Sequence, residues 1–242
     1  MTSTVGADYS EIYDPDLDFD RYYTMATARR IAPSVQPPDR VLELGCATGL
    51  MSELIIRDRG PASWLGLDRS GRYLDRARAR RLPGASFLSA DLNALTELGP
   101  ARTGYQHILA TNVLHEVEDP VAFLEAAAAR LSPGGLIHVT LQNPMSLHRL
   151  CAFDTGMIDD LTAIADRGAR FGTRGLWPAA DLVELGRRAG LHVKEQDGIM
   201  LKPLPNYLMA QLPEEVLEGF IASARRLPEF AAMNYLALGA IS

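Results

Sequence analysis

Lysine is scarce in this chain, and positive charge as a whole falls short of negative charge. The 242 residues include 24 basic side chains, of which Lys194 and Lys202 are the only lysines, against 30 acidic ones, for a formal charge of −6. A net negative chain lacks the broad positive surface on which nucleic acid or anionic lipid binds. We therefore expect a small molecule as substrate, and neither nucleic acid nor a membrane as partner.

Metal-binding and secretion signals are missing as well. The two cysteines, Cys46 and Cys151, form no ligand pair, and histidines and carboxylates do not recur at spacings such as H-E-x-x-H. No apolar run reaches the roughly 18 residues of a membrane helix. The first residues do not place a basic region before an apolar core, as a secretory signal does. These absences predict a metal-free cytoplasmic protein with reduced thiols.

A glycine-punctuated turn is the most informative feature that is present. In Val41-Leu-Glu-Leu-Gly-Cys-Ala-Thr-Gly49 an apolar run ends in a loop, where Gly45 and Gly49 allow left-handed backbone and close approach to a ligand. A helix over 50–59 would aim its free N–H groups at that ligand. The spacing is not G-x-G-x-x-G, because position 47 is alanine and position 50 is leucine, and no lysine follows as in a Walker loop. The segment predicts a nucleotide-binding loop of another kind.

Short apolar runs alternate with amphipathic segments along the chain, a pattern typical of a parallel α/β sheet. We expect strands over 40–44, 63–67, 86–89, 107–111 and 136–141, and further strands over 191–195 and 231–241. We expect helices over 70–82, capped by Ser70, over 120–131, ended by Ser-Pro-Gly-Gly, and over 144–153, 156–166 and 178–189. In such a sheet the ligand lies beyond the carboxyl ends of the strands.

Acidic residues stand at the ends of the second and third expected strands. Asp68, 19 residues past Gly49, is placed to accept both ribose hydroxyls of an adenosine ligand. Asp91, in Ser89-Ala-Asp-Leu92, is placed to accept the adenine amino group. The loop combined with these acids is a more specific signal than either feature alone.

Together these segments resemble the class I S-adenosylmethionine-dependent methyltransferases. The hallmark segments VLELGCATG, WLGLDRS, SADL, TNVLHEVEDP and LSPGGLIHVTLQNP occur in that order, over about residues 38–142. The resemblance implies an α/β, Rossmann-like class I methyltransferase fold: a mostly parallel seven-stranded sheet of order 3-2-1-4-5-7-6, with helices on both faces and a helical lid. It also implies an N-terminal helical lid segment over 1–35, and a methyltransferase domain over 36–242 with helical insertions at about 143–178 and 202–228.

The resemblance also implies roles in cofactor binding. Glu43 would support the methionine ammonium directly or through water, Asp68 would bind the ribose and Asp91 the adenine, and Asn112 would offer its backbone near the amino acid end. The set implied for S-adenosylmethionine and its product S-adenosylhomocysteine is Tyr13, Glu43, Gly45, Cys46, Ala47, Gly49, Asp68, Arg69, Ala90, Asp91, Leu92, Asn112 and Val113.

The sequence departs from the family at two places. Ala47 stands where the family often has glycine, and alanine is tolerated there unless its φ is positive. Gln106 and His107 stand near a position that is often aspartate, which puts in doubt any role for an acid at the start of the fourth strand.

Candidates for catalysis and acceptor binding follow the strands or precede the first one. The imidazole of His115 suits proton abstraction near neutral pH, and its alternative is a rim histidine that packs or bonds to Glu116. Tyr9 and Tyr13 would enclose a cation with their aromatic faces, or staple the N-terminal helix to the sheet. The other acceptor-binding candidates, with helix caps or solvated loop residues as the alternative, are Asn143, His148, Arg149, Arg174 and Trp177.

These features predict an enzyme that transfers a methyl group from S-adenosylmethionine to an O or N nucleophile of a small-molecule acceptor, by in-line displacement without metal, in natural-product metabolism. Two alternatives stay open: a regulator that binds the same cofactor without transferring methyl, and a nicotinamide-dependent oxidoreductase, whose G-x-G-x-x-G geometry is missing. An RNA methyltransferase is less favoured, since the basic run Arg76–Arg81 fits a helix exterior. Association into a homodimer is left open.

Overall fold

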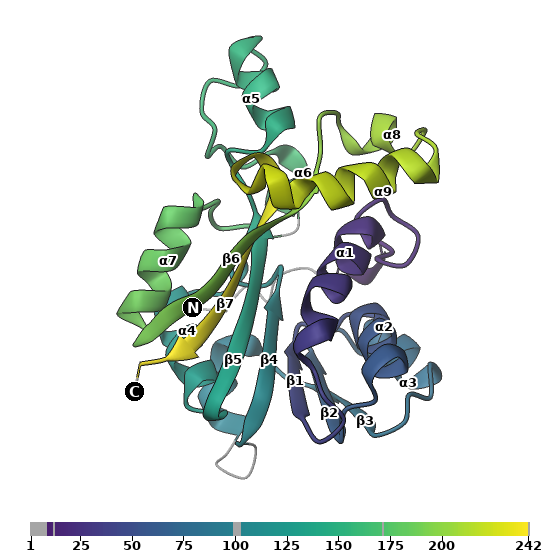
Figure 1. Cartoon of the computed structure of the whole chain (residues 1–242), viewed down its shortest axis with the longest axis vertical. Coiled ribbons are helices and arrows are strands. Elements are labelled where there is room, and N and C mark those ends of the chain that lie inside the picture. The colour runs from purple at the N-terminus through teal and green to yellow at the C-terminus, as the bar shows by residue number, and fades with distance from the viewer. Residues whose placement is uncertain (1–8, 12, 99–102, 171, 242) are drawn as a thin grey trace.

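The computed structural model describes residues 9–11, 13–98, 103–170 and 172–241, which form one seven-stranded sheet with helices around it (Figure 1). The strands are β1 (Arg40–Leu44), β2 (Ser63–Asp68), β3 (Ala85–Ser89), β4 (Tyr105–Thr111), β5 (Leu131–Gln142), β6 (Leu191–Leu201) and β7 (Ala231–Ala240). Their order is β3-β2-β1-β4-β5-β7-β6. The strands β1 to β5 run parallel, and β7 lies antiparallel between β5 and β6. The strand order expected from the sequence is confirmed.

Helices pack on both faces of the sheet. One face carries α1 (Arg21–Ile31), α2 (Leu50–Arg59) and α3 (Gly71–Ala79), and the other carries α4 (Pro120–Ala128), α7 (Ala179–Arg188) and the 3-10 segment η3 (Leu92–Leu98). Helix α3 begins where the sequence predicts, because Ser70 Oγ accepts the N–H of Tyr73 at 3.4 Å. Short 3-10 segments at Tyr9–Glu11 (η1) and Ala32–Ser34 (η2) flank α1.

The central strand β1 is buried on both sides, and this position carries a carboxylate into the core. Val41 packs on the side of α1, α2 and α3, and Leu42 packs on the opposite side, each at most 1% exposed. Side chains alternate along a strand, so Glu43 faces the same side as Val41. The Glu43 carboxylate is therefore held inside the fold, near the carboxyl end of β1, and Arg40 at the start of the strand is its exposed residue.

The remaining helices gather beyond the end of the sheet at which β4 ends (Figure 1). They are α5 (Leu147–Asp154), α6 (Asp166–Arg170), α8 (Asn206–Met209) and α9 (Glu214–Ser223), with the 3-10 segments η4 (Ala224–Arg226) and η5 (Pro228–Phe230). Of the ranges expected for the two insertions, 143–178 contains α5 and α6, and 202–228 contains α8, α9 and η4, whereas η5 extends two residues beyond it. No helix in the described ranges is long and apolar enough to cross a membrane.

Three expectations about local structure need correction. The helix expected over 156–166 is wrong: that stretch is irregular, and only the short α6 follows it. Helix α4 ends at Ala128, before the Ser-Pro-Gly-Gly stop, and that stop is the irregular start of β5, with Gly134 at φ +77°. Strand β6 continues six residues past the predicted end at Glu195, to Leu201.

Candidate active site

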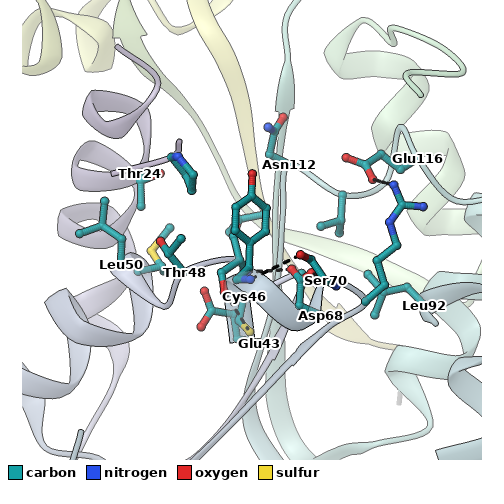
Figure 2. Close-up of a pocket in the computed structure, with 18 of the residues that line it drawn as sticks. Thr24, Glu43, Cys46, Thr48, Leu50, Asp68, Ser70, Leu92, Asn112 and Glu116 are labelled. Carbon is teal, nitrogen blue, oxygen red and sulfur yellow. Dashed lines mark hydrogen bonds and ion pairs between the residues drawn. The ribbon is translucent and has the colours of Figure 1, made fainter. Parts of the chain in front are cut away.

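A first cavity of about 210 Å³ opens at the carboxyl ends of β1, β2 and β4 (Figure 2). Twelve of the thirteen residues predicted to bind cofactor line this first cavity, and the thirteenth, Gly49, caps α2 beside it. Eleven of these twelve come from the glycine loop with the end of β1, the ends of β2 and β3, and the loop after β4, and the twelfth, Tyr13, comes from the segment before α1. The topology thus brings together what the sequence spacing placed at neighbouring strand ends.

The glycine loop needs left-handed backbone at three positions, Gly45 (φ +80°), Ala47 (φ +43°) and Gly49 (φ +75°). A Cβ on Gly45 would lie 2.3 Å from Val113 Cγ1, so no larger residue fits there. The expectation that alanine is tolerated at position 47 depended on a negative φ, and the observed φ is positive. Ala47 therefore carries a conformational cost of about 1–2 kcal/mol that glycine would avoid.

Asp68 holds this loop through its carboxylate. Its Oδ2 accepts the N–H of Ala47 at 2.8 Å and its Oδ1 accepts the N–H of Ser70 at 2.9 Å. Burial raises the pKa of Asp68, and the hydrogen bonds from the backbone oppose that rise. Each oxygen keeps acceptor capacity for a further donor, so the carboxylate that shapes the loop can also receive hydroxyl groups of a ligand.

Glu43 lies deeper, at 1% exposure, on the floor of the first cavity. Its Oε2 accepts the hydroxyl of Ser52 and the indole N–H of Trp64, the latter at 3.0 Å. Burial raises the pKa of Glu43 to about 8. A cation placed in the cavity would favour the ionised form, which fits the predicted role beside an ammonium group.

The charges around the first cavity restrict its ligand. Five carboxylates line it, those of Asp20, Glu43, Asp68, Asp91 and Glu116, whereas Arg69 is the only basic residue among its described lining residues. An acidic cavity favours a ligand with positive charge and several hydrogen-bond donors, and disfavours phosphate groups. Ammonium, ribose hydroxyl and adenine amino groups are such donors, so the residues fit S-adenosylmethionine and oppose a dinucleotide.

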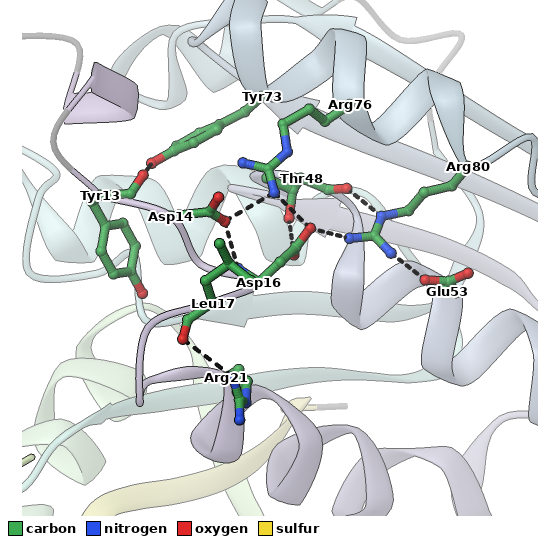
Figure 3. Close-up of polar contacts among 10 residues, drawn as sticks. All are labelled: Tyr13, Asp14, Asp16, Leu17, Arg21, Thr48, Glu53, Tyr73, Arg76 and Arg80. Atoms are coloured by element: carbon green, nitrogen blue, oxygen red, sulfur yellow. Dashed lines mark hydrogen bonds and ion pairs between the residues drawn. The ribbon is translucent and has the colours of Figure 1, made fainter. Parts of the chain in front are cut away.

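The segment between Tyr13 and α1 is fixed over the glycine loop by ion pairs (Figure 3). Asp16 Oδ2 contacts Arg76 Nη2 at 2.8 Å and Arg80 Nη2 at 2.6 Å, and Asp16 Oδ1 accepts the hydroxyl of Thr48 at 2.6 Å. Arg80 also pairs with Glu53 of α2. We call Asp16, Arg76 and Arg80 the ionic latch. The Arg76–Arg81 run, expected to be a plain helix exterior, thus contributes two of its arginines to this contact.

A second cavity, of about 340 Å³, adjoins the first. The two cavities share a wall, which consists of Tyr13, Asp20, Tyr23, Asn112, Glu116 and Met233. Within the wall, Asp20 accepts the hydroxyl of Tyr13 at 3.4 Å and the amide of Asn206 at 2.8 Å, and Asn206 accepts the hydroxyl of Tyr23 at 3.4 Å. These bonds join the N-terminal segment to α8, across 186 residues of sequence.

His115 lines the second cavity and not the first, and it is buried at 4% exposure rather than placed on a rim. Burial lowers the pKa of His115 to about 4. Its Nε2 lies 3.7 Å from Glu116 Oε1, and its buried Nδ1 has no hydrogen-bond partner within the described ranges. A general base works best with a pKa near the working pH, so this imidazole fits a hydrogen bond to an acceptor better than proton removal.

The acceptor-binding candidates divide into two groups. Asn143, His148 and Arg149 line the second cavity, although the side-chain amide of Asn143 is already bonded to backbone at Met145, Glu229 and Ala231. Arg174 and Trp177 line neither cavity. Arg174 is exposed and pairs with Glu118 at 3.7 Å, and Trp177 is partly buried and packs against the hydrophobic core. The side chain of Tyr9 lies outside the described part of the chain.

Asn112 sits where the cavities meet and has φ +56°. Its backbone N–H donates to Thr140 at 2.8 Å, so of its backbone groups only the carbonyl is left to meet a ligand. The sequence offered no signal for several other lining residues. Asp20, Asn206 and Lys202 belong to segments without a motif, and long-range contacts alone bring them to the cavities.

The sheet with its antiparallel β7 and the helices on both faces define a Rossmann-like α/β fold, with an acidic cavity at the carboxyl ends of its strands. The family model described as a methyltransferase domain matches residues 18–196. Trans-aconitate 2-methyltransferase of Methylobacterium nodulans is 36% identical over 115 residues, which cover 47% of this chain and 43% of that relative. Ubiquinone biosynthesis O-methyltransferase of Rhizobium johnstonii is 31% identical over 170 residues, 69% of this chain and 65% of that relative. The chain thus matches less than two thirds of the length of each.

Solved structures share the fold. An S-adenosylmethionine-dependent methyltransferase from Mesorhizobium loti superposes with a TM-score of 0.63 at 18% identity, covering 91% of this chain and 99% of that one. The [4+2]-cyclase SpnF gives a TM-score of 0.61 at 21% identity, over 90% of this chain and 81% of that one. Since a cyclase shares the architecture, the fold alone does not fix the reaction. By its family match, the chain belongs to the class I S-adenosylmethionine-dependent methyltransferases.

Proposed function

We propose that this methyltransferase transfers the methyl group of S-adenosylmethionine to an O or N nucleophile of a small-molecule acceptor, without metal, in natural-product metabolism in the cytoplasm. The observation that carries the proposal is the wall shared by the two cavities. A cofactor in the first cavity and an acceptor in the second would meet at Tyr13, Asp20 and Glu116. The described residues form no metal-binding cluster of histidine, cysteine and carboxylate.

The named relatives favour oxygen as the nucleophile. One is a ubiquinone biosynthesis O-methyltransferase and another a trans-aconitate 2-methyltransferase, names that give the natural-product pathway no support. A cavity of about 340 Å³ is within the range of small-molecule sites. Its size and the net charge of −6 favour a metabolite over nucleic acid or a membrane. A homodimer stays compatible with all of these features.

The chain itself contributes placement of the reactants. When bound, S-adenosylmethionine supplies an electrophilic methyl group on its sulfonium. Orientation by a closed cavity accounts for up to about 7–11 kcal/mol of a barrier in well-placed systems. Where an acceptor hydroxyl must lose its proton, the carboxylates of Asp20 and Glu116 line both cavities and are the candidate bases. His115, in the second cavity, would hydrogen-bond to the acceptor instead, because burial lowers its pKa to about 4.

Calorimetric titration with S-adenosylhomocysteine tests the cofactor half of the proposal, and binding with a dissociation constant below 1 mM is expected. Incubation with methyl-labelled S-adenosylmethionine and a metabolite extract then tests transfer. Label in a small product supports an enzyme, whereas tight cofactor binding with no labelled product supports the non-catalytic regulator. A titration with NADH is expected to stay flat, and saturable binding there would favour the oxidoreductase.

A further inference from the structure

Charge is segregated in the second cavity. Its carboxylates, Asp20 and Glu116, both belong to the wall shared with the first cavity. The described residues that line the second cavity alone include Arg149 and Lys202 but no aspartate or glutamate. An acceptor in this cavity therefore meets negative charge on the cofactor side and positive charge on the far side.

Arg149 is held in place by the loop that follows α5. Its Nε donates to the carbonyl of Leu161 at 2.9 Å, and its Nη2 donates to the carbonyl of Ala163 at 2.7 Å. No hydrogen bond within the described ranges engages its Nη1. The carboxylate of Asp160 acts on this guanidinium by its charge, and it is itself exposed and bonded to Thr162. A guanidinium oriented in this way keeps donor capacity for an anion.

Lys202 and His148 lie beside Arg149. The backbone N–H of His148 donates to the carbonyl of Lys202 at 3.1 Å, and the positive charges of Lys202 and Arg149 add to burial in lowering the pKa of His148 to about 3. His148 is therefore neutral, and its buried Nδ1 lacks a partner within the described ranges. Lys202 is 9% exposed, and its positive charge adds to that of Arg149 on the part of the cavity away from the shared wall.

We infer that the acceptor carries an oxyanion, a carboxylate or a phosphate, which binds at Arg149, Lys202 and His148, while its nucleophile lies at the wall shared with the first cavity. The cavity is also lined by Ile164 and Leu176, and by Met233 at the shared wall, and these side chains suit a hydrocarbon body. A charge pair of this kind fixes the direction in which the acceptor enters. This inference rests on the proposed function, since it names the acceptor class of the same site.

Ligand-observed NMR titration of enzyme saturated with S-adenosylhomocysteine tests the inference, with benzoate, phenyl phosphate and uncharged benzamide as probes at constant ionic strength. We expect one of the two anions to bind at least tenfold more tightly than benzamide. A preference for benzoate assigns a carboxylate and a preference for phenyl phosphate assigns a phosphate. If neither anion binds more tightly than benzamide, the inference is overturned.

Two variants with a matched control locate the binding. Lys202→Met and Arg149→Gln should each lower the affinity for the preferred anion at least fivefold. Lys194→Met, which removes the exposed lysine of β6, should leave that affinity unchanged. Lys202→Arg serves if Lys202→Met does not fold, and should keep the preference for an anion over benzamide. Equal anion affinity in wild type and Lys202→Met overturns the assignment. Because S-adenosylhomocysteine affinity is measured separately, its absence in the wild type would count against the proposed function and not against the acceptor class.

Discussion

The backbone N–H of Ala47 donates to the carboxylate of Asp68 at 2.8 Å, and this bond joins the glycine loop after β1 to the end of β2. Ala47 has φ +43°, so the bond holds an alanine in left-handed geometry. The same carboxylate lines the first cavity. Loop conformation and ligand binding at this edge of the sheet therefore depend on one side chain.

Replacing Asp68 with asparagine should lower the affinity for S-adenosylhomocysteine at least tenfold, which corresponds to about 1.4 kcal/mol. One side-chain oxygen becomes an NH₂ donor, which then faces the N–H of Ala47 or of Ser70 instead of accepting from it. Calorimetry measures the affinity. Asp58→Asn, in α2, provides a control with an exposed carboxylate. Equal affinity in Asp68→Asn and wild type would contradict the assigned role.

Replacing Ala47 with glycine should raise the free energy of unfolding by roughly 0.5–1 kcal/mol. Glycine avoids about 1–2 kcal/mol of left-handed cost and adds about 0.5–1 kcal/mol of backbone entropy. Urea unfolding checks the value. The same change at Ala126, within α4, should destabilise by about 0.5–1 kcal/mol because φ there is helical. A loss of stability at both positions would show that Ala47 is not strained.

Glu43→Gln should make stability less dependent on pH. The pKa of Glu43 in the folded protein is about 8, above its ordinary value of 4.5, so the folded state holds the proton more tightly. This contribution is complete at pH 4.5 and below and is lost as the pH rises through 8. The stability of Glu43→Gln relative to wild type should therefore increase between pH 5 and 8. Parallel curves in chemical denaturation would exclude a raised pKa.

His138 links two other buried side chains of the sheet, His107 and Tyr235, and it should make the protein sensitive to acid. Its Nε2 lies 2.9 Å from His107 Nδ1 and its Nδ1 lies 2.9 Å from the hydroxyl of Tyr235. Burial lowers the pKa of His138 to about 3, from 6.5. The folded state favours the neutral form of His138. The contribution of this residue to the free energy of unfolding is therefore complete above pH 6.5 and decreases as the pH falls toward 3, by at most about 1.4 kcal/mol per pH unit.

The variant His138→Phe tests this dependence. At pH 7 its free energy of unfolding should fall by about 1–3 kcal/mol, because His107 Nδ1 and the Tyr235 hydroxyl lose their contacts with the ring nitrogens of His138. The difference in free energy of unfolding between wild type and variant should shrink as the pH falls from 6.5 to 4, since phenylalanine binds no proton. A difference that does not change with pH would mean that protonation of His138 is not linked to unfolding.

Asp16→Asn should open the ionic latch. It removes the charge that pairs with Arg76 and Arg80, which are 41% and 16% exposed, so a loss of about 1 kcal/mol is expected for the network. At low salt, S-adenosylhomocysteine should bind roughly fivefold more weakly, and the difference from wild type should narrow at high salt. Asp75→Asn, which affects the exposed pair with Arg78 on the same helix, should leave affinity unchanged. Similar losses in both variants would assign the effect to general charge.

The part of the fold that could be predicted from sequence is the part set by local periodicity. Strand β1 and helix α2 begin and end at the predicted residues, and the parallel arrangement then places Glu43, Asp68 and Asp91 in one cavity. The prediction of a helix over 156–166 failed for two physical reasons. Arg149 binds the carbonyls of Leu161 and Ala163, and the Asp160 carboxylate accepts from Thr162, so long-range and side-chain bonds replace helical ones.

Other features that the sequence did not predict also arise from contacts between distant parts of the chain. The positive φ of Ala47 follows from its bond to Asp68, and the burial of His115 follows from packing around the second cavity; neither has a sequence pattern. Trp177 stands in a glycine-rich turn typical of an exposed loop, yet it is partly buried and packs against the hydrophobic core. Asp20 and Asn206 meet only because α8 folds over the N-terminal segment.

The hydrogen bond between Asp20 and Asn206 joins the N-terminal segment, before β1, to α8, after β6. Neither the stretch before β1 nor the stretch after β6 can swing outward without breaking it or carrying the other along. Because Asp20 lines both cavities and Asn206 lines the second, an outward movement of either segment would reshape the boundary between the two compartments.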